Sequence, residues 1–167
     1  MKKLIAIAAA LFFSAGISTF ASGPKEEKSP GKRINYQLAF SNIELSDDID
    51  LVLQESTNKV IDISGSEADI ERVDWKIKNG ILYLSSKKGS LKDKVKVTVS
   101  VSQLKRLDVF GKSVVNSLGE LGSKSLMVTI DGDSYVSLKN TGNIYVTNSL
   151  NTELDVRRLV GEVVVRM

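Results

Sequence analysis

The chain has 167 residues, of which 42% are apolar and 26% charged, with 23 basic and 20 acidic side chains and no cysteine or histidine. This length suits one domain and not two of ordinary size. The missing cysteines exclude disulfides and thiolate chemistry, and the missing histidines remove the commonest general base and the commonest metal ligand.

The first 21 residues have the pattern of a secretory signal peptide. Met1-Lys2-Lys3 is a basic start, residues 4–13 are apolar throughout, and a segment of small residues ends at Ala21. The apolar segment is shorter than the roughly 20 residues that a membrane-spanning helix needs. We therefore predict that residues 1–21 are removed on export, to the periplasm or cell surface of a bacterium. Loss of Lys2 and Lys3 leaves a nearly neutral chain, so nucleic acid is not an expected partner.

Residues 22–33 are predicted to be a flexible linker, and residues 34–167 a single domain. The linker segment has no large apolar residue and contains both prolines of the chain, Pro24 and Pro30. The rest of the chain has no proline, so every backbone N–H stays available for sheet hydrogen bonds. The composition of residues 34–167 therefore favours β-structure.

The domain begins with segments of alternating polarity that predict β-strands. Residues 34–40, 49–53 and 95–101 place apolar side chains at every second position, as strands with one buried face do. Asn79-Gly80 separates two apolar runs and predicts a tight hairpin, because both residues accept positive φ. Residues 66–73 are the one helical candidate, with Ser66 at the position of an N-cap.

The C-terminal third contains apolar pairs that recur every 8–10 residues. The pairs are Val128/Ile130, Val136/Leu138, Ile144/Val146, Leu154/Val156 and Val163/Val165. A second register, of 21 residues, maps one set onto another: Val109, Gly111, Ser113 and Val115 onto Ile130, Gly132, Ser134 and Val136. Strands at this spacing fit an antiparallel β-sandwich, and they also fit a solenoid with one coil per roughly 20 residues. The 21-residue register favours an all-β, parallel β-helix-like solenoid, with the antiparallel β-sandwich as the alternative.

Two tyrosines are the candidate binding residues. Tyr135 and Tyr145 alternate with the inward pairs, so their side chains are predicted to point outward, and two tyrosines on one face would form a small binding surface. Asp131 and Asp133 supply part of a calcium loop without the rest of its pattern, and aspartates are common in turns, so no metal site is predicted. The sequence contains no recognisable catalytic constellation, so neither catalytic residues nor a cofactor are expected.

The end of the sequence, Glu162 to Met167, is an apolar, strand-like run. No polar cap follows it, and an open final strand exposes unpaired backbone groups. We therefore expect this end to be covered by self-association through residues 162–167, or by a partner that adds a strand.

The order of several segments resembles the putative auto-transporter adhesin, head GIN domain family. The resembling segments lie within residues 34–146 and are residues 40–45, 49–53, 60–65, 78–84, 97–101, 111–113 and 132–134. The resemblance implies a right-handed β-helix-like fold, secreted in Bacteroidetes-like bacteria. It brings no established catalytic or binding residues to carry over.

These observations lead to one functional hypothesis and two alternatives. The hypothesis is an exported, non-catalytic, adhesin-like envelope domain that presents a β-helical surface to an unknown protein or glycan. The alternatives are a small carbohydrate-active enzyme that uses paired carboxylates and a purely structural spacer in the envelope. An enzyme of the first kind needs many coils to build a groove, and the predicted domain, at roughly 20 residues per coil, would have about six or seven.

Overall fold

The computed structural model of the protein describes residues 30–87, 91, 93–148, 153–158 and 163–166. The predicted signal peptide and most of the predicted linker lie outside the described residues, so both stay predictions. Strand β1 (Gly31–Asn35) pairs antiparallel with β4 (Val60–Ser64), and Arg33 binds Asp62 across that pair at 2.7 Å. Residues 31–33 of the predicted linker therefore belong to a strand, because the edge of a sheet offers them backbone partners that their polar composition does not reveal.

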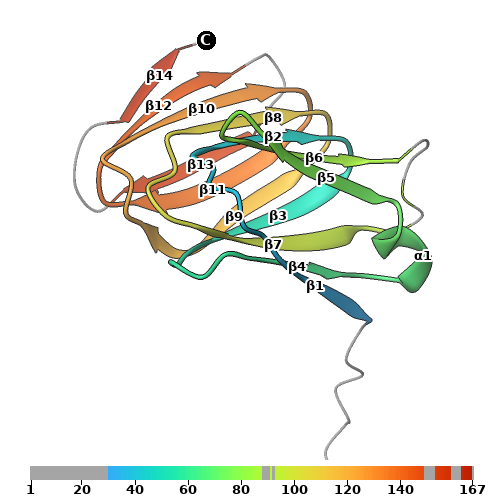
Figure 1. The fold of residues 1–167 in the computed structure, drawn as a ribbon. Coiled ribbons are helices and arrows are strands. Elements are labelled where there is room, and N and C mark those ends of the chain that lie inside the picture. The colour runs from blue at the N-terminus through green and yellow to red at the C-terminus, as the bar shows by residue number, and fades with distance from the viewer. Residues whose placement is uncertain (1–29, 88–90, 92, 149–152, 159–162, 167) are drawn as a thin grey trace, which may run out of the picture.

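The described strands form two sheets that face each other (Figure 1). Sheet A contains, in spatial order, β1, β4, β7 (Val95–Val101), β3 (Ile49–Glu55), β9 (Val114–Leu121), β11 (Tyr135–Asn140) and β13 (Glu153–Arg158). Sheet B contains β14 (Val163–Arg166), β12 (Asn143–Asn148), β10 (Ser125–Asp131), β8 (Arg106–Phe110), β2 (Asn42–Ser46), β6 (Ile81–Ser86) and β5 (Val73–Lys78). The prediction of an all-β domain is confirmed.

From β8 onward the chain alternates between the sheets, and from β10 onward each strand pairs in parallel with the strand two places earlier. The pairs are β8–β10, β10–β12 and β12–β14 in sheet B and β9–β11 and β11–β13 in sheet A. The predicted 21-residue register is present, since Val109 lies beside Ile130 and Val115 beside Val136.

Both sheets nevertheless contain parallel and antiparallel pairs, whereas a uniform solenoid or an antiparallel sandwich would have one kind of pairing. Three pairs are antiparallel: β5 with β6, which follow each other in a hairpin, and β1 with β4 and β4 with β7, which are distant in the sequence.

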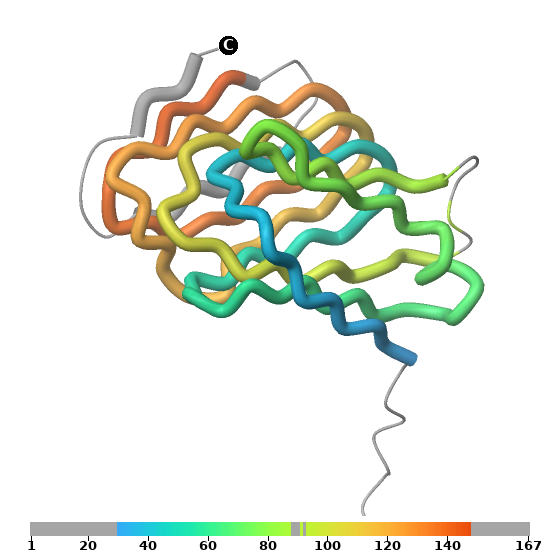
Figure 2. The backbone as a smooth tube through the Cα atoms, viewed as in Figure 1, coloured from blue at the N-terminus to red at the C-terminus, as the bar shows by residue number. Residues whose placement is uncertain are grey.

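In the first half of the domain, the order of the strands within the sheets differs from their order in the sequence. The β2–β3 unit lies between the later units β6–β7 and β8–β9, so residues 102–105 must pass from one side of it to the other (Figure 2). Lys105 N–H donates to Ser41 O at 2.7 Å where this connection crosses the start of β2. The crossing places the loop that contains Lys105 against the end of sheet B at which β2 begins.

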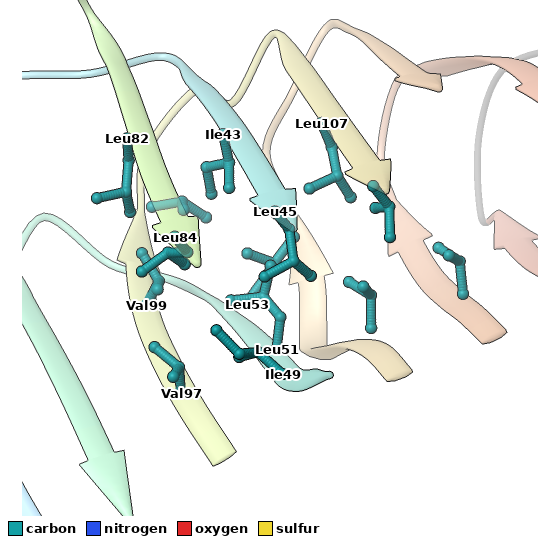
Figure 3. Close-up of a cluster of buried hydrophobic side chains, with 14 of the residues drawn as sticks. Ile43, Leu45, Ile49, Leu51, Leu53, Leu82, Leu84, Val97, Val99 and Leu107 are labelled. Carbon is teal, nitrogen blue, oxygen red and sulfur yellow. The ribbon is translucent and has the colours of Figure 1, made fainter. Parts of the chain in front are cut away.

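The core is a double layer of aliphatic side chains between the sheets (Figure 3). Leu51, Leu53, Val97 and Val99 point inward from sheet A, and Ile43, Leu45, Leu82, Leu84 and Leu107 point inward from sheet B; all are at most 1% exposed. Full burial of such a side chain is worth about 1.5–3 kcal/mol. The alternating polarity of the sequence therefore identifies the buried face of these strands.

Glycine and serine stack on one another where the chain turns from sheet B into sheet A. Gly132 has φ +126°, and a Cβ there would lie 2.4 Å from Gly111 O, so only glycine fits. Ser134 Oγ donates to Gly111 O at 2.9 Å, and Ser113 Oγ donates to Asp47 O at 2.6 Å. The repeated glycine and serine thus close successive coils against each other.

Two local predictions are confirmed. Asn79 and Gly80 have positive φ and join β5 to β6 in an antiparallel hairpin. Helix α1 (Glu67–Ile70) is shorter than the predicted range, and Ser66 caps it by accepting a hydrogen bond from Asp69 N.

Candidate binding surface

The structure places the two predicted tyrosines on different sheets. Tyr135 lies on β11 of sheet A and is half-buried, whereas Tyr145 lies on β12 of sheet B and is 39% exposed. The two residues therefore do not share a face. The polarity pattern gives the direction of each side chain relative to its own strand, but it does not say that consecutive strands belong to opposite sheets.

Tyr145 has an apolar neighbour on the outer face of sheet B. It lies opposite Met127 of β10, which is 48% exposed, and Phe110 of β8 is a third exposed apolar side chain of this sheet. Asn143 Nδ2 and the Tyr145 hydroxyl are 3.5 Å apart, a long contact at the outer end of the ring. Sheet B thus presents an aromatic ring and a thioether to solvent side by side.

A hollow of about 390 Å³ lies directly beside Met127. Its lining residues come from two neighbouring connections and the strand that follows: Gln103, Leu104, Lys105, Ser123, Lys124, Ser125 and Met127. The connections are those from β7 to β8 and from β9 to β10, which enter sheet B at the same end. The hollow therefore combines an apolar wall with hydroxyl, amide and ammonium groups.

Side-chain hydrogen bonds to the backbone hold the β9–β10 connection in place. The amide of Asn140, a fully buried residue, accepts from Ser123 N at 3.1 Å and donates to Ser123 O at 2.9 Å. On the other side, Glu55 accepts from Gly122 N at 2.9 Å, and Gln103 Nε2 donates to Gly122 O at 3.0 Å. These contacts preorganise the wall of the hollow, since each uses a backbone group that a turn would otherwise leave unpaired.

The ammonium groups of Lys105 and Lys124 form no ion pair with any carboxylate of the described residues. Arg106, which follows Lys105, differs because its guanidinium contacts both carboxylate oxygens of Asp108 at 2.7–2.9 Å. None of the described residues that line the hollow is acidic. The region is consequently suited to a negatively charged group.

A second, smaller hollow of about 160 Å³ lies nearer the other end of sheet B. Glu44, Asp74 and Tyr83 are among its lining residues, and Lys76 Nζ lies 5.0 Å from the centre of the Tyr83 ring. This cation–π contact covers part of the ring that a ligand would need. The hollow beside Met127 is therefore the better candidate site.

Other polar groups of interest have structural partners. Asp133 lies 3.8 Å from Lys112, and within the described ranges no cluster of three or more acidic residues could hold a metal ion. Burial raises the pKa of Tyr36, whose hydroxyl donates to Ser100 O at 2.9 Å and thereby fastens the segment after β1.

The fold and this surface define the protein as a two-sheet β-domain of mostly parallel strands with an exposed apolar and basic region. The family model described as "Putative auto-transporter adhesin, head GIN domain" matches residues 39–166. The chain belongs to this family, as the resemblance of its motifs predicts.

Solved structures with a similar chain trace include proteins from two Parabacteroides species. A putative adhesin from Parabacteroides merdae is 14% identical, with 85% of this chain and 98% of that chain covered and a TM-score of 0.47. A putative adhesin from Parabacteroides distasonis is 13% identical, with 81% and 95% covered and a TM-score of 0.45. A putative lipid binding protein from the same species is 15% identical, with 84% and 67% covered and a TM-score of 0.45. No curated protein matches the sequence.

The described part of the chain has no helix of the length and apolarity that crossing a membrane requires.

Sequence reasoning missed the residues of the hollow. Lys105 and Lys124 lie in separate segments of the sequence, and Met127 stands between the apolar Leu126 and Val128, so no local pattern marks them as site residues. Only the crossing of residues 102–105 over the β2–β3 unit brings these loops together. The 21-residue register, extended back one coil, is the one signal in the sequence that could have aligned Lys105 with residues near 126.

Proposed function

We propose that the protein is an exported, non-catalytic, adhesin-like domain of the bacterial envelope, which binds a protein or glycan through the outer face of a β-helical arrangement of strands. The family description, an auto-transporter adhesin domain, supports the adhesive role. The predicted signal peptide, residues 1–21, supports export to the periplasm or the cell surface.

The observation that carries this proposal is the outer face of sheet B. Met127 and Tyr145 stay exposed next to a preorganised hollow. Exposed apolar side chains beside convergent polar groups are typical of binding surfaces. Of the two predicted tyrosines, Tyr145 belongs to this surface, and Tyr135 would serve a separate contact on sheet A.

A binding array with a parallel activity assay tests this function. Purified protein is applied to immobilised bacterial and host polysaccharides and cell-surface proteins, and the same polysaccharides are assayed for released sugar ends. We expect retention on at least one ligand without release of products. Product release that a single Asp→Asn or Glu→Gln change abolishes would overturn the non-catalytic assignment, and absence of any retention would favour a structural spacer.

A further inference from the structure

The hollow beside Met127 has features that select for one class of ligand. Its apolar wall continues from Met127 to the ring of Tyr145, which lies opposite it on the neighbouring strand. An exposed aromatic ring beside a thioether gives a flat, polarisable surface, of the kind against which the C–H face of a sugar ring packs.

The polar groups of the hollow suit a hydroxyl-rich ligand. Gln103 and Ser125 line it, and Ser123 is only 1% exposed with an Oγ that has no hydrogen-bond partner among the described residues. A buried hydroxyl without a partner is costly, and a bound group that pairs with it would remove that cost. Asn140 fixes the backbone of Ser123 on both its N–H and its C=O, so this hydroxyl is held at a defined place.

The charge of the hollow points to an anion. Lys105 and Lys124 come from neighbouring connections, and both are exposed and free of ion pairs with the described carboxylates. A peptide would need a free strand edge or a deep anchor pocket, but β8, β10 and β12 are each paired on both sides. A short acidic saccharide fits these conditions better than an acidic peptide.

We propose that this hollow binds an acidic saccharide, a sugar that carries a carboxylate or sulfate group. The ring packs on Met127 and Tyr145, the anionic group interacts with Lys105 and Lys124, and a ring hydroxyl pairs with Ser123. This inference rests on the proposed binding function and names its ligand class.

Calorimetric titration of the purified protein tests the inference. The probes are a tetramer of galacturonic acid, a sulfated heparin tetrasaccharide, the neutral galactose tetramer and a tetraglutamate peptide. We expect at least one acidic saccharide to bind, the neutral tetramer to bind at least ten-fold more weakly, and affinity to fall as salt increases. The two anionic sugars distinguish a carboxylate ligand from a sulfate ligand.

Variants locate the binding to the hollow. Lys105→Ala and Lys124→Ala should each weaken binding of the acidic sugar about ten-fold, and the double variant should abolish it. Tyr145→Ala should weaken it as well. Lys96→Ala, an exposed lysine on β7 of sheet A, is the matched control and should bind as the unmodified protein does.

Three results would overturn the inference: no binding of either acidic sugar, undiminished binding by the Lys105→Ala/Lys124→Ala variant, or tetraglutamate binding as tight as the sugar. Retention on a protein or a neutral glycan in the array would then still support the proposed function. A circular dichroism spectrum and melting curve of each variant identify any loss that comes from unfolding.

Discussion

At the scale of single residues, the stacked turns place the strictest demands on the sequence. Gly132 is the clearest case, because both its positive φ and the backbone of Gly111 exclude a side chain. The 21-residue register pairs these two glycines in the sequence alone. The register does not show that the two glycines are in contact, because a repeat gives their separation along the chain and not their distance in space.

Gly132→Ala should destabilise the protein by more than 3 kcal/mol, because a Cβ would meet backbone that cannot move aside. The control is Gly119→Ala, since Gly119 also has positive φ but has no atom within 4 Å of its would-be Cβ. This control should cost about 1 kcal/mol. Urea unfolding of both variants makes the comparison, and equal losses would contradict the stacking of the turns.

Asn140 connects the stability of the fold to the candidate site. Asn140→Ala removes both hydrogen bonds to Ser123 in a buried place, so we expect a loss of about 2–4 kcal/mol in the free energy of unfolding. Asn58→Ala changes an exposed loop residue and should cost less than about 0.5 kcal/mol. If thermal or urea unfolding of the Asn140→Ala protein matches that of the control, Asn140 does not hold the turn.

At the scale of elements, alternating polarity predicts the strands and the face that each one buries. Residues 95–101 become β7 with Val95, Val97 and Val99 fully buried, and Asn79-Gly80 becomes a hairpin. The order of the strands could not be predicted, because nothing local to β2 and β3 indicates that later strands will flank them on both sides. For the same reason, Tyr135 and Tyr145 seemed to belong to one face.

A pair of lysine substitutions tests which side chains of β7 face the core. Val99→Lys puts a charge into the closed layer between the sheets and should cost several kcal/mol, whereas Thr98→Lys, which faces outward beside Asp62, should cost little. The melting temperatures of the two variants measure the difference. Similar decreases in both would mean that the buried face of β7 is assigned to the wrong residues.

At the scale of the whole molecule, export and assembly are the two properties about which the described residues say least. Intact mass spectrometry of the exported protein should give a chain that begins at Ser22, because the small residues before it form the predicted cleavage site. A mature protein that keeps Met1 would contradict the signal peptide.

Strand β14 is the outermost strand of sheet B within the described residues, with β12 as its one neighbour there. An unpaired edge can bind the same edge of a second molecule, so we expect a dimer whose fraction rises with concentration and falls in Val164→Lys. Light scattering from micromolar to near-millimolar concentration measures it. A strict monomer over that range would exclude self-association through Glu162 to Met167.

The central claim is that the outer face of sheet B is the binding surface of this domain. Amide hydrogen exchange, with and without the saccharide or other ligand that the array identifies, tests it most directly. The account predicts that the ligand slows exchange in residues 103–106, 122–127 and 143–147 and leaves β3, β7 and β9 of sheet A unchanged. Protection confined to sheet A, around Tyr135 and its neighbours, would contradict it.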